Sequence, residues 1–308
     1  MVTGGPNGLD VASARDRETR LRQGAEVART RFTSSYEMLD PVDPAGCQPE
    51  RGQRSRDFIH SLEKGLAVIN SFSEDRSTQT ASEVAERVGV SRSTARRILL
   101  TLHKLGYANR VGGEFELTAK VLDLGYSFLS SLRVAAVAQE PLQRLVDELG
   151  ETSSMSVLDG AGIVCVARFP TKQIMTTALR LGSRLPAYPT AMGRVLLADL
   201  ADDAIEAYFS GVELKRFTPH TITDRSTLRA AIEQVRVDGF AVVDQELEIG
   251  VRSVAAPIIN HRGDVVAAAN VSCPAVRVSL SELKSEFLPK LLATVEEINF
   301  STRYLERM

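Results

Sequence analysis

The fold of this chain is decided between Thr80 and Gly113, which read TASEVAERVGVSRSTARRILLTLHKLGYANRVGG. Thr80 and Glu83 have the spacing of a capping box, in which each side chain accepts a hydrogen bond from the backbone N–H of the other residue at a helix start. Gly89 can take the left-handed conformation that ends many helices. These signals predict a short helix over residues 81–88.

A second helix is predicted directly after Ser91, a residue type that caps helix N-termini. Its apolar residues recur at helical spacing and predict one buried stripe, formed by Ala95, Ile98, Leu99, Leu102 and Leu105. At about 100° per residue, the first turn and the opposite face carry Arg92, Ser93, Thr94, Arg96, Arg97 and Lys104. Serine, threonine and arginine on the first turns are what a recognition helix presents to the major groove of DNA.

The segment after this helix has the pattern of a β-hairpin. Two strand-like runs, 107–111 and 114–117, flank Gly112 and Gly113. A Gly-Gly pair permits the positive φ angles of a two-residue hairpin loop. This hairpin is the expected wing of a winged helix-turn-helix.

The charge pattern points to a nucleic-acid partner. Residues from Arg87 to Gly113 include arginines and a lysine but no Asp or Glu, in a chain of net charge −2. A local excess of positive charge suits contact with phosphates, and it favours a double-stranded DNA operator over the alternative, a structural helix pair with solvated arginines. The expected contact residues are Thr80, Ser91, Arg92, Ser93, Thr94, Arg96, Arg97 and Arg110.

Length and composition limit the other possibilities. The chain of 308 residues has room for about two domains, and its apolar content of 44% is ordinary for a soluble globular protein. No apolar run approaches the roughly 20 residues of a membrane span. The three cysteines form no CxxC and the four histidines lie far apart, so no disulfide framework, metal site or cofactor is expected. We expect a cytoplasmic protein.

Four segments are expected along the chain: a disordered extension over 1–56, a winged helix-turn-helix over 57–118, a linker helix over 119–132, and a second domain over 133–308. In the second domain, strands are predicted over 153–158, 163–168, 174–181, 240–246, 253–259 and 265–272. Helices are predicted there over 133–149, 191–200, 224–237 and 280–305. Strands grouped in triplets around helices favour an α+β fold, with an antiparallel sheet flanked by helices.

Further segments carry a family resemblance. They read SLEKGL at 61–66, GSRLP at 182–186, TAMGR at 190–194 and ELEIGVRSVAAP at 246–257. Together with the two helices that follow Thr80, they resemble the IclR family of bacterial transcriptional regulators from Phe58 to the C-terminus. LPAY at 185–188 and VRVSL at 276–280 look most like the PcaR/PcaU/PobR branch, which controls the β-ketoadipate pathway and related catabolism of aromatic acids.

The resemblance implies a winged helix, a linker helix and a C-terminal effector-binding domain with a GAF-like fold. It also implies a homodimer or a dimer of dimers, whose grip on a promoter changes when a small carboxylate effector binds. We therefore interpret the chain as a sequence-specific regulator of aromatic-acid catabolism genes. Two alternatives remain: an IclR-type regulator that senses a non-aromatic metabolite, and a GAF-like signalling module. An enzyme is disfavoured, because the chain has no GxSxG elbow and no histidine near the expected effector segments.

The expected effector site begins at Thr190, which precedes a helix. A helix N-terminus offers free N–H groups to a carboxylate, and Gly193 would let a ligand approach the backbone. Tyr188 and Met192 would cover an aromatic ring. The residues alone also allow a plain helix cap at Thr190 and a packing role for Gly193. The resemblance favours the ligand, because in this family the loop borders the effector site.

By the same resemblance, the ligand is faced from strands by Val243, Ser253, Asn270 and Ser272. Val243 stands where some relatives carry Asp, so the pocket is expected to be less polar and to suit an aromatic acid. Glu246 and Arg252 are expected to pair with each other and to brace the turn at Gly250.

Overall fold

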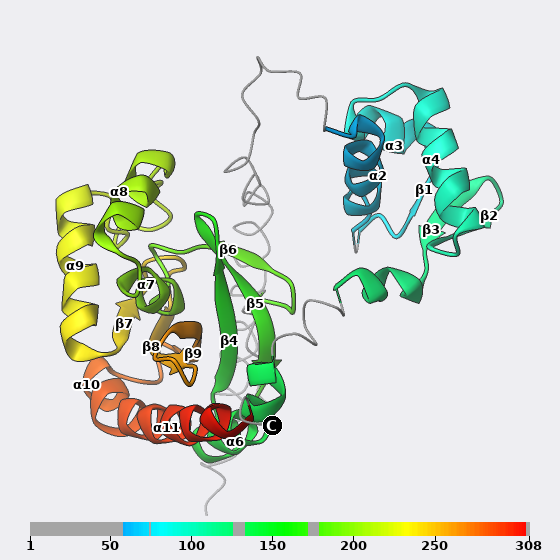
Figure 1. Ribbon diagram of the computed structural model, residues 1–308. Coiled ribbons are helices and arrows are strands. Elements are labelled where there is room, and N and C mark those ends of the chain that lie inside the picture. Colours follow the sequence, from blue (N-terminus) through cyan, green and yellow to red (C-terminus); the bar gives the residue numbers. More distant parts are fainter. Residues whose placement is uncertain (1–57, 74, 126–132, 172–178, 306–308) are drawn as a thin grey trace, which may run out of the picture. The chain divides into compact units, whose positions relative to one another are not determined.

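The structure is a computed structural model that describes residues 58–73, 75–125, 133–171 and 179–305. These residues form two compact units, and the boundary between the units falls between Ala136 and Val137 (Figure 1). The expected extension over 1–56 lies outside the described residues, as does the second half of the expected linker helix. The first half of that helix contains a 3-10 turn, Ala119–Val121, followed by helical residues 122–125.

The winged-helix part of the first unit is built on the helices α2 (His60–Asn70), α3 (Ala81–Val88) and α4 (Arg92–Lys104). Thr80 and Glu83 form the predicted capping box at the start of α3, and Gly89 ends this helix with a φ of 69°. Ser91 caps α4 by accepting a hydrogen bond from the backbone N–H of Thr94. Local capping chemistry therefore sets both ends of the turn between α3 and α4.

The predicted wing is confirmed as a hairpin of β2 (Ala108–Val111) and β3 (Glu114–Leu117). The two loop residues, Gly112 and Gly113, have φ angles of 58° and 104°. A short strand, β1 (Thr78–Gln79), pairs with the other edge of β3, so the small sheet has the order β1-β3-β2. The winged helix-turn-helix is thereby complete.

The core of this unit contains Val68, Val84, Leu99 and Phe115, one from each of α2, α3, α4 and β3. The prediction that Leu105 belongs to the buried stripe is wrong, because this side chain is 55% exposed. Leu105 is the residue at the C-terminal cap of α4, where the helix no longer faces the core.

The second unit is built on a six-stranded antiparallel sheet of order β6-β5-β4-β9-β8-β7. Its strands are β4 (Thr152–Asp159), β5 (Gly162–Phe169), β6 (Arg184–Pro186), β7 (Ala241–Asp244), β8 (Val251–Ile259) and β9 (Val265–Pro274). Its helices are α6 (Arg133–Leu149), α7 (Ala191–Ala198), α8 (Asp202–Gly211), α9 (Arg225–Asp238), α10 (Leu280–Glu282) and α11 (Leu288–Leu305). The predicted α+β fold is confirmed.

Helices cover both faces of this sheet (Figure 1). On one face, α7 packs against β8 and β9, and α9 packs against α7; on the other face, α11 packs against β8. Strand β4 is buried over six consecutive residues, from Thr152 to Val157, as expected where helices lie on both sides of a sheet. Because α7 packs on β8 and β9, it lies directly over the sheet.

Three features differ from the sequence-based expectations. Of the strand predicted over 174–181, residues 174–178 lie outside the described residues and 179–181 are not in a strand. The edge partner of β5 is instead the three-residue strand β6. Helix α8 was not predicted, because its N-cap, Ala201, has no side chain that could signal a cap. A π-helical turn, Leu283–Phe287, interrupts the C-terminal helix. Among the described residues, no helix is both long and apolar enough to cross a membrane.

Candidate functional site

The first candidate site is the outward face of α4. Arg92, Ser93, Arg96 and Arg97 are all exposed on its first two turns. The hydroxyl of Ser91 lies 2.9 Å from that of Ser93 and 2.8 Å from that of Thr94, so these hydroxyls hold one another at the helix start. None of the three arginines forms an ion pair with a described residue. Their guanidinium groups are therefore available to phosphates and to base edges.

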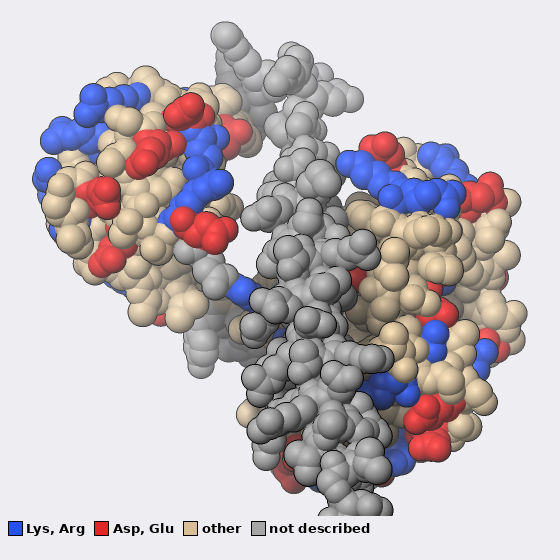
Figure 2. All heavy atoms as spheres, turned by 180° about the vertical axis from the view of Figure 1, so that it is seen from behind, with Lys and Arg blue, Asp and Glu red and all other residues tan. Residues whose placement is uncertain are grey.

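The wing adds one exposed cation, Arg110, which lies opposite Phe115 in the β2–β3 pairing. On the face shown in Figure 2, the unit that contains α4 carries Lys and Arg side chains interspersed with Asp and Glu. The positive charge is therefore local to particular surfaces. Thr80 differs from the other expected contacts, because its hydroxyl and its N–H are both bonded to the carboxylate of Glu83.

An apolar groove of about 570 Å³ lies between α2 and α4. Four of its leucines are strongly exposed: Leu62 at 59%, Leu66 at 49%, Leu105 at 55% and Leu124 at 51%. Arg97 and Thr94 line the same groove, so it adjoins the outward face of α4. Sequence analysis missed the groove, although Leu62 and Leu66 are spaced one helical turn apart.

The second candidate site is a cavity of about 70 Å³ in the unit over 137–305, between the first turn of α7, the sheet and the segment that joins β7 to β8. Its lining residues are Leu179, Leu185, Pro189, Thr190, Ala191, Met192, Val243, Leu247, Glu248, Val251, Ser253, Asn270 and Ser272. Six of the eight predicted effector residues are thus brought together. The two that do not line the cavity are Tyr188 and Gly193.

One wall of the cavity is the start of α7. The hydroxyl of Thr190 accepts a hydrogen bond from the N–H of Gly193 at 3.0 Å and donates one to the carbonyl of Ala187 at 3.0 Å. The first N–H groups of a helix have no acceptor inside the helix, and those of Ala191 and Met192 belong to residues that line the cavity. This wall therefore presents hydrogen-bond donors at the positive end of a helix dipole.

The opposite wall carries a small polar cluster. The side-chain amide of Asn270 donates to the hydroxyls of Ser253, at 2.9 Å, and Ser272, at 2.8 Å. Its carbonyl oxygen accepts from the backbone N–H of Ser154 at 3.0 Å, which fixes the orientation of the amide. Both amide hydrogens are used within the cluster, and the Ser253 hydroxyl donates to the carbonyl of Val271 at 3.1 Å and accepts from the Ser272 hydroxyl at 3.2 Å. A lone pair of the Ser272 hydroxyl therefore stays available to a ligand.

Gly193 and Tyr188 have roles other than those expected. A Cβ atom on residue 193 would lie 2.0 Å from the carbonyl oxygen of Ala187, so the glycine is required for the close approach of α7 to that backbone. Tyr188 is 1% exposed, and its hydroxyl donates to the carbonyl of Lys215 at 2.6 Å. Burial raises the pKa of Tyr188 to about 12, and its ring lies 6.2 Å from that of Phe217. Tyr188 thus packs beneath a loop, away from the cavity.

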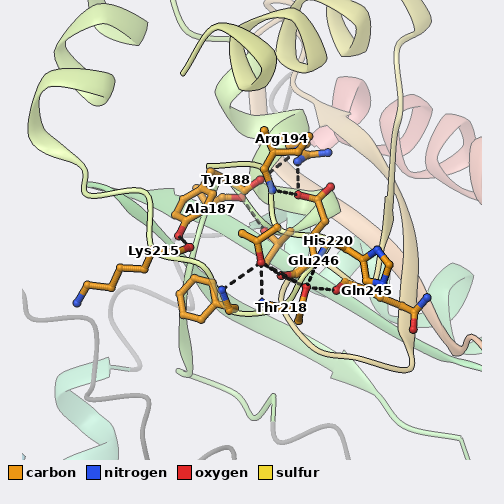
Figure 3. A network of polar contacts seen from close by, with 12 residues as sticks. Ala187, Tyr188, Arg194, Lys215, Thr218, His220, Gln245 and Glu246 are labelled. Carbon is orange, nitrogen blue, oxygen red and sulfur yellow. Dashed lines mark hydrogen bonds and ion pairs between the residues drawn. The ribbon is translucent and has the colours of Figure 1, made fainter. Parts of the chain in front are cut away.

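The expected pairing of Glu246 with Arg252 is wrong. Glu246 binds Arg194 of α7, with 2.6 Å between its carboxylate and the guanidinium, as Figure 3 shows. Arg252 binds Asp244, which lies directly opposite it in the β7–β8 register, at 2.8 Å. Asp244 satisfies Arg252 within the sheet, whereas Glu246 lies beyond the end of β7, where the chain leaves the sheet and turns toward α7.

Sequence analysis also missed several residues of the cavity, namely Leu179, Leu185, Pro189, Leu247, Glu248 and Val251. Leu247, Glu248 and Val251 lie within the stretch 246–257 that carried the family resemblance. Their position in that stretch could have identified them as residues of the cavity. The described lining contains one acidic side chain, Glu248, and no Lys, Arg or His. No group of His, Cys, Asp and Glu among the described residues is arranged to hold a metal ion.

The comparisons with known proteins match both units to one family. The IclR helix-turn-helix domain model matches residues 61–112, and the model for the bacterial transcriptional regulator IclR C-terminal domain matches residues 126–300. The chain is 44% identical over 243 residues to the Pca regulon regulatory protein of Pseudomonas putida, covering 79% of this chain and 84% of that protein.

Two solved structures extend this likeness. A transcriptional regulator from Rhodococcus sp. RHA1, RHA06195, has a TM-score of 0.74 and 49% identity, covering 80% of this chain and 100% of that one. A double mutant of the PobR inducer-binding domain from Acinetobacter, in complex with 3-hydroxybenzoic acid, has a TM-score of 0.52 and 34% identity, covering 54% of this chain and 97% of that one. The chain belongs to the IclR family of bacterial transcriptional regulators.

Proposed function

We propose that this regulator binds a hydroxylated aromatic acid in the cavity beside α7, and that the bound acid controls its grip on operators of aromatic-acid catabolism genes in the cytoplasm. The observation that carries the proposal is the combination, around one cavity, of a helix N-terminus, two serine hydroxyls and an apolar wall. The names of the Pca regulator and of the PobR complex with 3-hydroxybenzoic acid support the same class of ligand.

The proposed pose follows from the two polar walls. The carboxylate binds the N–H groups of Ala191 and Met192, which lie at the positive end of the α7 dipole. The ring lies against Val243 and the other apolar lining residues, and a ring hydroxyl reaches Ser253 and Ser272. A ring hydroxyl can donate a hydrogen bond to the Ser272 oxygen, whose own hydrogen is donated to Ser253.

The size of the cavity requires some movement on binding. A cavity of about 150 Å³ is large enough to bind benzene, whereas this one measures about 70 Å³. A hydroxybenzoate is larger than benzene, so lining side chains must shift to admit it. Such a shift gives the ligand-bound unit a conformation that differs from the ligand-free one. A regulator needs this difference in order to respond to its effector.

DNA recognition is assigned to α4 and the wing. Ser93, Arg96 and Arg97 contact base edges in the major groove, while Arg92 and Arg110 bind phosphates. A second copy of the chain covers the leucines of the groove between α2 and α4 and leaves Arg97 at the edge of the groove open to DNA, because four strongly exposed leucines there would otherwise face water. The resulting homodimer presents two recognition helices to the two halves of an operator.

The function is tested by titrating the full chain with 4-hydroxybenzoate, 3-hydroxybenzoate, protocatechuate and, as a non-aromatic control, pyruvate. A ligand that binds the folded state raises the melting temperature with its concentration, and a regulator leaves the ligand chemically unchanged. We expect at least one aromatic acid to raise the melting temperature and to alter operator binding, and pyruvate to do neither. A response to pyruvate alone would assign the chain to a different pathway, and turnover of any of these acids would make it an enzyme.

A further inference from the structure

We infer that the buried ion pair between Arg194 and Glu246 is a positioning device, which holds the segment 245–251 as a wall of the cavity and thereby sets the affinity for the effector. The identity of the effector rests on the proposed function. That the ion pair holds the segment 245–251 in place does not depend on it. Neither residue lines the cavity, so the pair acts through the elements that it joins.

The pair is almost completely removed from water, with 5% of the Arg194 side chain and 8% of the Glu246 side chain exposed. Arg194 lies on α7, one turn beyond the residues that line the cavity. Its guanidinium donates through Nε to the carbonyl of Tyr188 at 3.0 Å and through Nη2 to Glu246 at 2.6 Å (Figure 3). The arginine is thus held at two points, and its direction toward Glu246 is determined.

Glu246 is tied to a third element as well. Its carboxylate accepts a hydrogen bond from the backbone N–H of Ile222 at 3.2 Å. Its backbone carbonyl accepts from the hydroxyl of Thr221 at 2.6 Å, and the carbonyl of Gln245 accepts from that of Thr218 at 2.6 Å. The loop over 217–222, helix α7 and the end of β7 therefore meet at one residue, as Figure 3 shows.

The segment that Glu246 anchors is closed on itself. The N–H of Gln245 donates to the carbonyl of Val251 at 2.8 Å, and the side chain of Gln245 accepts from the N–H of Gly250 at 3.0 Å. Gln245 has a φ of 59°, which is uncommon for a residue other than glycine and needs support from its surroundings. Leu247, Glu248 and Val251 line the cavity from this segment.

The two walls joined by the pair are therefore the two between which the ligand binds. Side chains beyond Glu246 must shift to admit an aromatic acid, and the anchor confines that shift to them. Without the anchor, the segment would have to be ordered at the expense of binding free energy, which lowers affinity.

The chain contains a matched control pair. Arg252 and Asp244 form an ion pair at 2.8 Å, with 11% and 30% of their side chains exposed. Since Val251 and Ser253 on the same strand face the cavity, Arg252 points to the opposite face of the sheet, where it also binds the carbonyl of Val278 at 2.6 Å. This pair supports the same unit without touching the cavity wall.

The test replaces each pair by apolar residues of similar size in the full chain. Replacing both members of a buried ion pair leaves no unpaired charge, so folding is retained more often than in single variants. For Arg194→Met with Glu246→Leu, we expect about tenfold weaker binding of 4-hydroxybenzoate or protocatechuate by calorimetry, and faster hydrogen exchange of the amides over 246–251 in the ligand-free protein. Arg252→Met with Asp244→Leu should change the affinity by less than about twofold and leave that exchange unaltered.

Affinity and exchange separate the two claims. If the unaltered protein binds none of the acids, the proposed function fails. Hydrogen exchange alone then tests whether the ion pair holds the segment 245–251 in place. Unchanged exchange over 246–251 in the Arg194 and Glu246 variant would overturn the inference, and so would equal loss of affinity in both double variants. If the double variant does not fold, Glu246→Gln, which keeps the shape of the side chain, is measured in the same way with Asp244→Asn as its control.

Discussion

The groups proposed to bind DNA lie on the outside of one helix and one hairpin in the unit up to Ala136, whereas the groups proposed to bind the effector face a cavity inside the unit that starts at Val137. The first arrangement suits a large polyanion, which must reach exposed cations such as Arg96 and Arg97. The second suits a small molecule that gives up its water, because Asn270 and its two serine neighbours are already oriented before a ligand arrives. Binding of DNA and binding of effector should therefore be separable by mutation.

The largest expected effect tests how tightly α7 is packed in the unit that contains the cavity. Gly193→Val would drive a side chain into the backbone of Ala187, 2.0 Å from the position of its Cβ, and should lower the free energy of unfolding by more than about 3 kcal/mol. Denaturant titration followed by circular dichroism measures this. Gly211→Ala is the control, because its Cβ meets open space. If Gly193→Val kept its stability and lost only effector binding, residue 193 would touch the ligand after all.

The next effect tests whether the unit that contains α4 also binds a second copy of the chain. Leu66→Asp would place a charge in the groove between α2 and α4, and burying an unpaired charge there costs several kcal/mol, so the variant should be monomeric at micromolar concentration. Light scattering measures the mass. Val237→Asp, at a position 81% exposed in the other unit, should leave the mass unchanged. A dimer of unaltered affinity in Leu66→Asp would move the interface elsewhere.

Base recognition should be the property of α4 alone. Ser93→Ala and Arg97→Ala are expected to weaken binding to the native operator more than to random DNA, by about 1–3 kcal/mol where a bidentate contact is lost. Fluorescence anisotropy with both DNAs measures the difference, and Arg262→Ala, at an exposed position in the other unit, serves as the control. Equal losses on both DNAs would mean that this face of α4 does not read bases. If Ser93→Ala or Arg97→Ala also lowered the affinity for the effector, binding of DNA and binding of effector would not be separable.

A smaller effect is expected from the polar cluster of the cavity. Ser272→Ala removes one hydroxyl from the ligand and leaves one N–H of Asn270 without its acceptor, so effector binding should weaken about tenfold. Ser156→Ala is a matched control on β4, because that buried hydroxyl has no partner. Calorimetry should show unaltered affinity in the control, and operator binding without effector should be unaltered in both. Unchanged effector affinity in Ser272→Ala would place the ligand hydroxyl elsewhere.

The smallest effect is expected from the wing. Arg110→Ala should weaken operator and random DNA equally, and should reduce the slope of log affinity against log salt by about one, as the loss of one phosphate contact does. Titrations at several salt concentrations measure the slope. A loss confined to the operator would make Arg110 a base contact.

Features with local causes were predictable from the sequence. The capping box of Thr80 and Glu83, the end of α3 at Gly89 and the hairpin at Gly112 and Gly113 each depend on residues within a few positions of one another. Strands and helices with clear periodicity were likewise located. Of the six predicted residues that line the cavity, Thr190 and Met192 were identified from the start of a helix, and the four strand residues from the family resemblance.

Features with distant causes were not predictable. Glu246 binds Arg194, which is 52 positions away, rather than the nearby Arg252. Gly193 is required because the backbone of Ala187 passes within 2.0 Å of its Cβ position, a fact of packing that residue types do not reveal. Tyr188 turns toward Lys215 because a loop supplies a buried acceptor for its hydroxyl there. Helix α8 begins at Asp202 after Ala201, which offers no side-chain cap, so only the acidic residues of its first turn marked its start.

The most direct test of the inward site is a crystal structure of the full chain with the aromatic acid that raises its melting temperature most. The account predicts the acid inside the cavity, with a carboxylate oxygen about 3 Å from the backbone nitrogen of Ala191 or Met192 and a ring hydroxyl within hydrogen-bond distance of Ser253 or Ser272. An acid bound outside this cavity, or bound with its carboxylate turned away from α7, would contradict it.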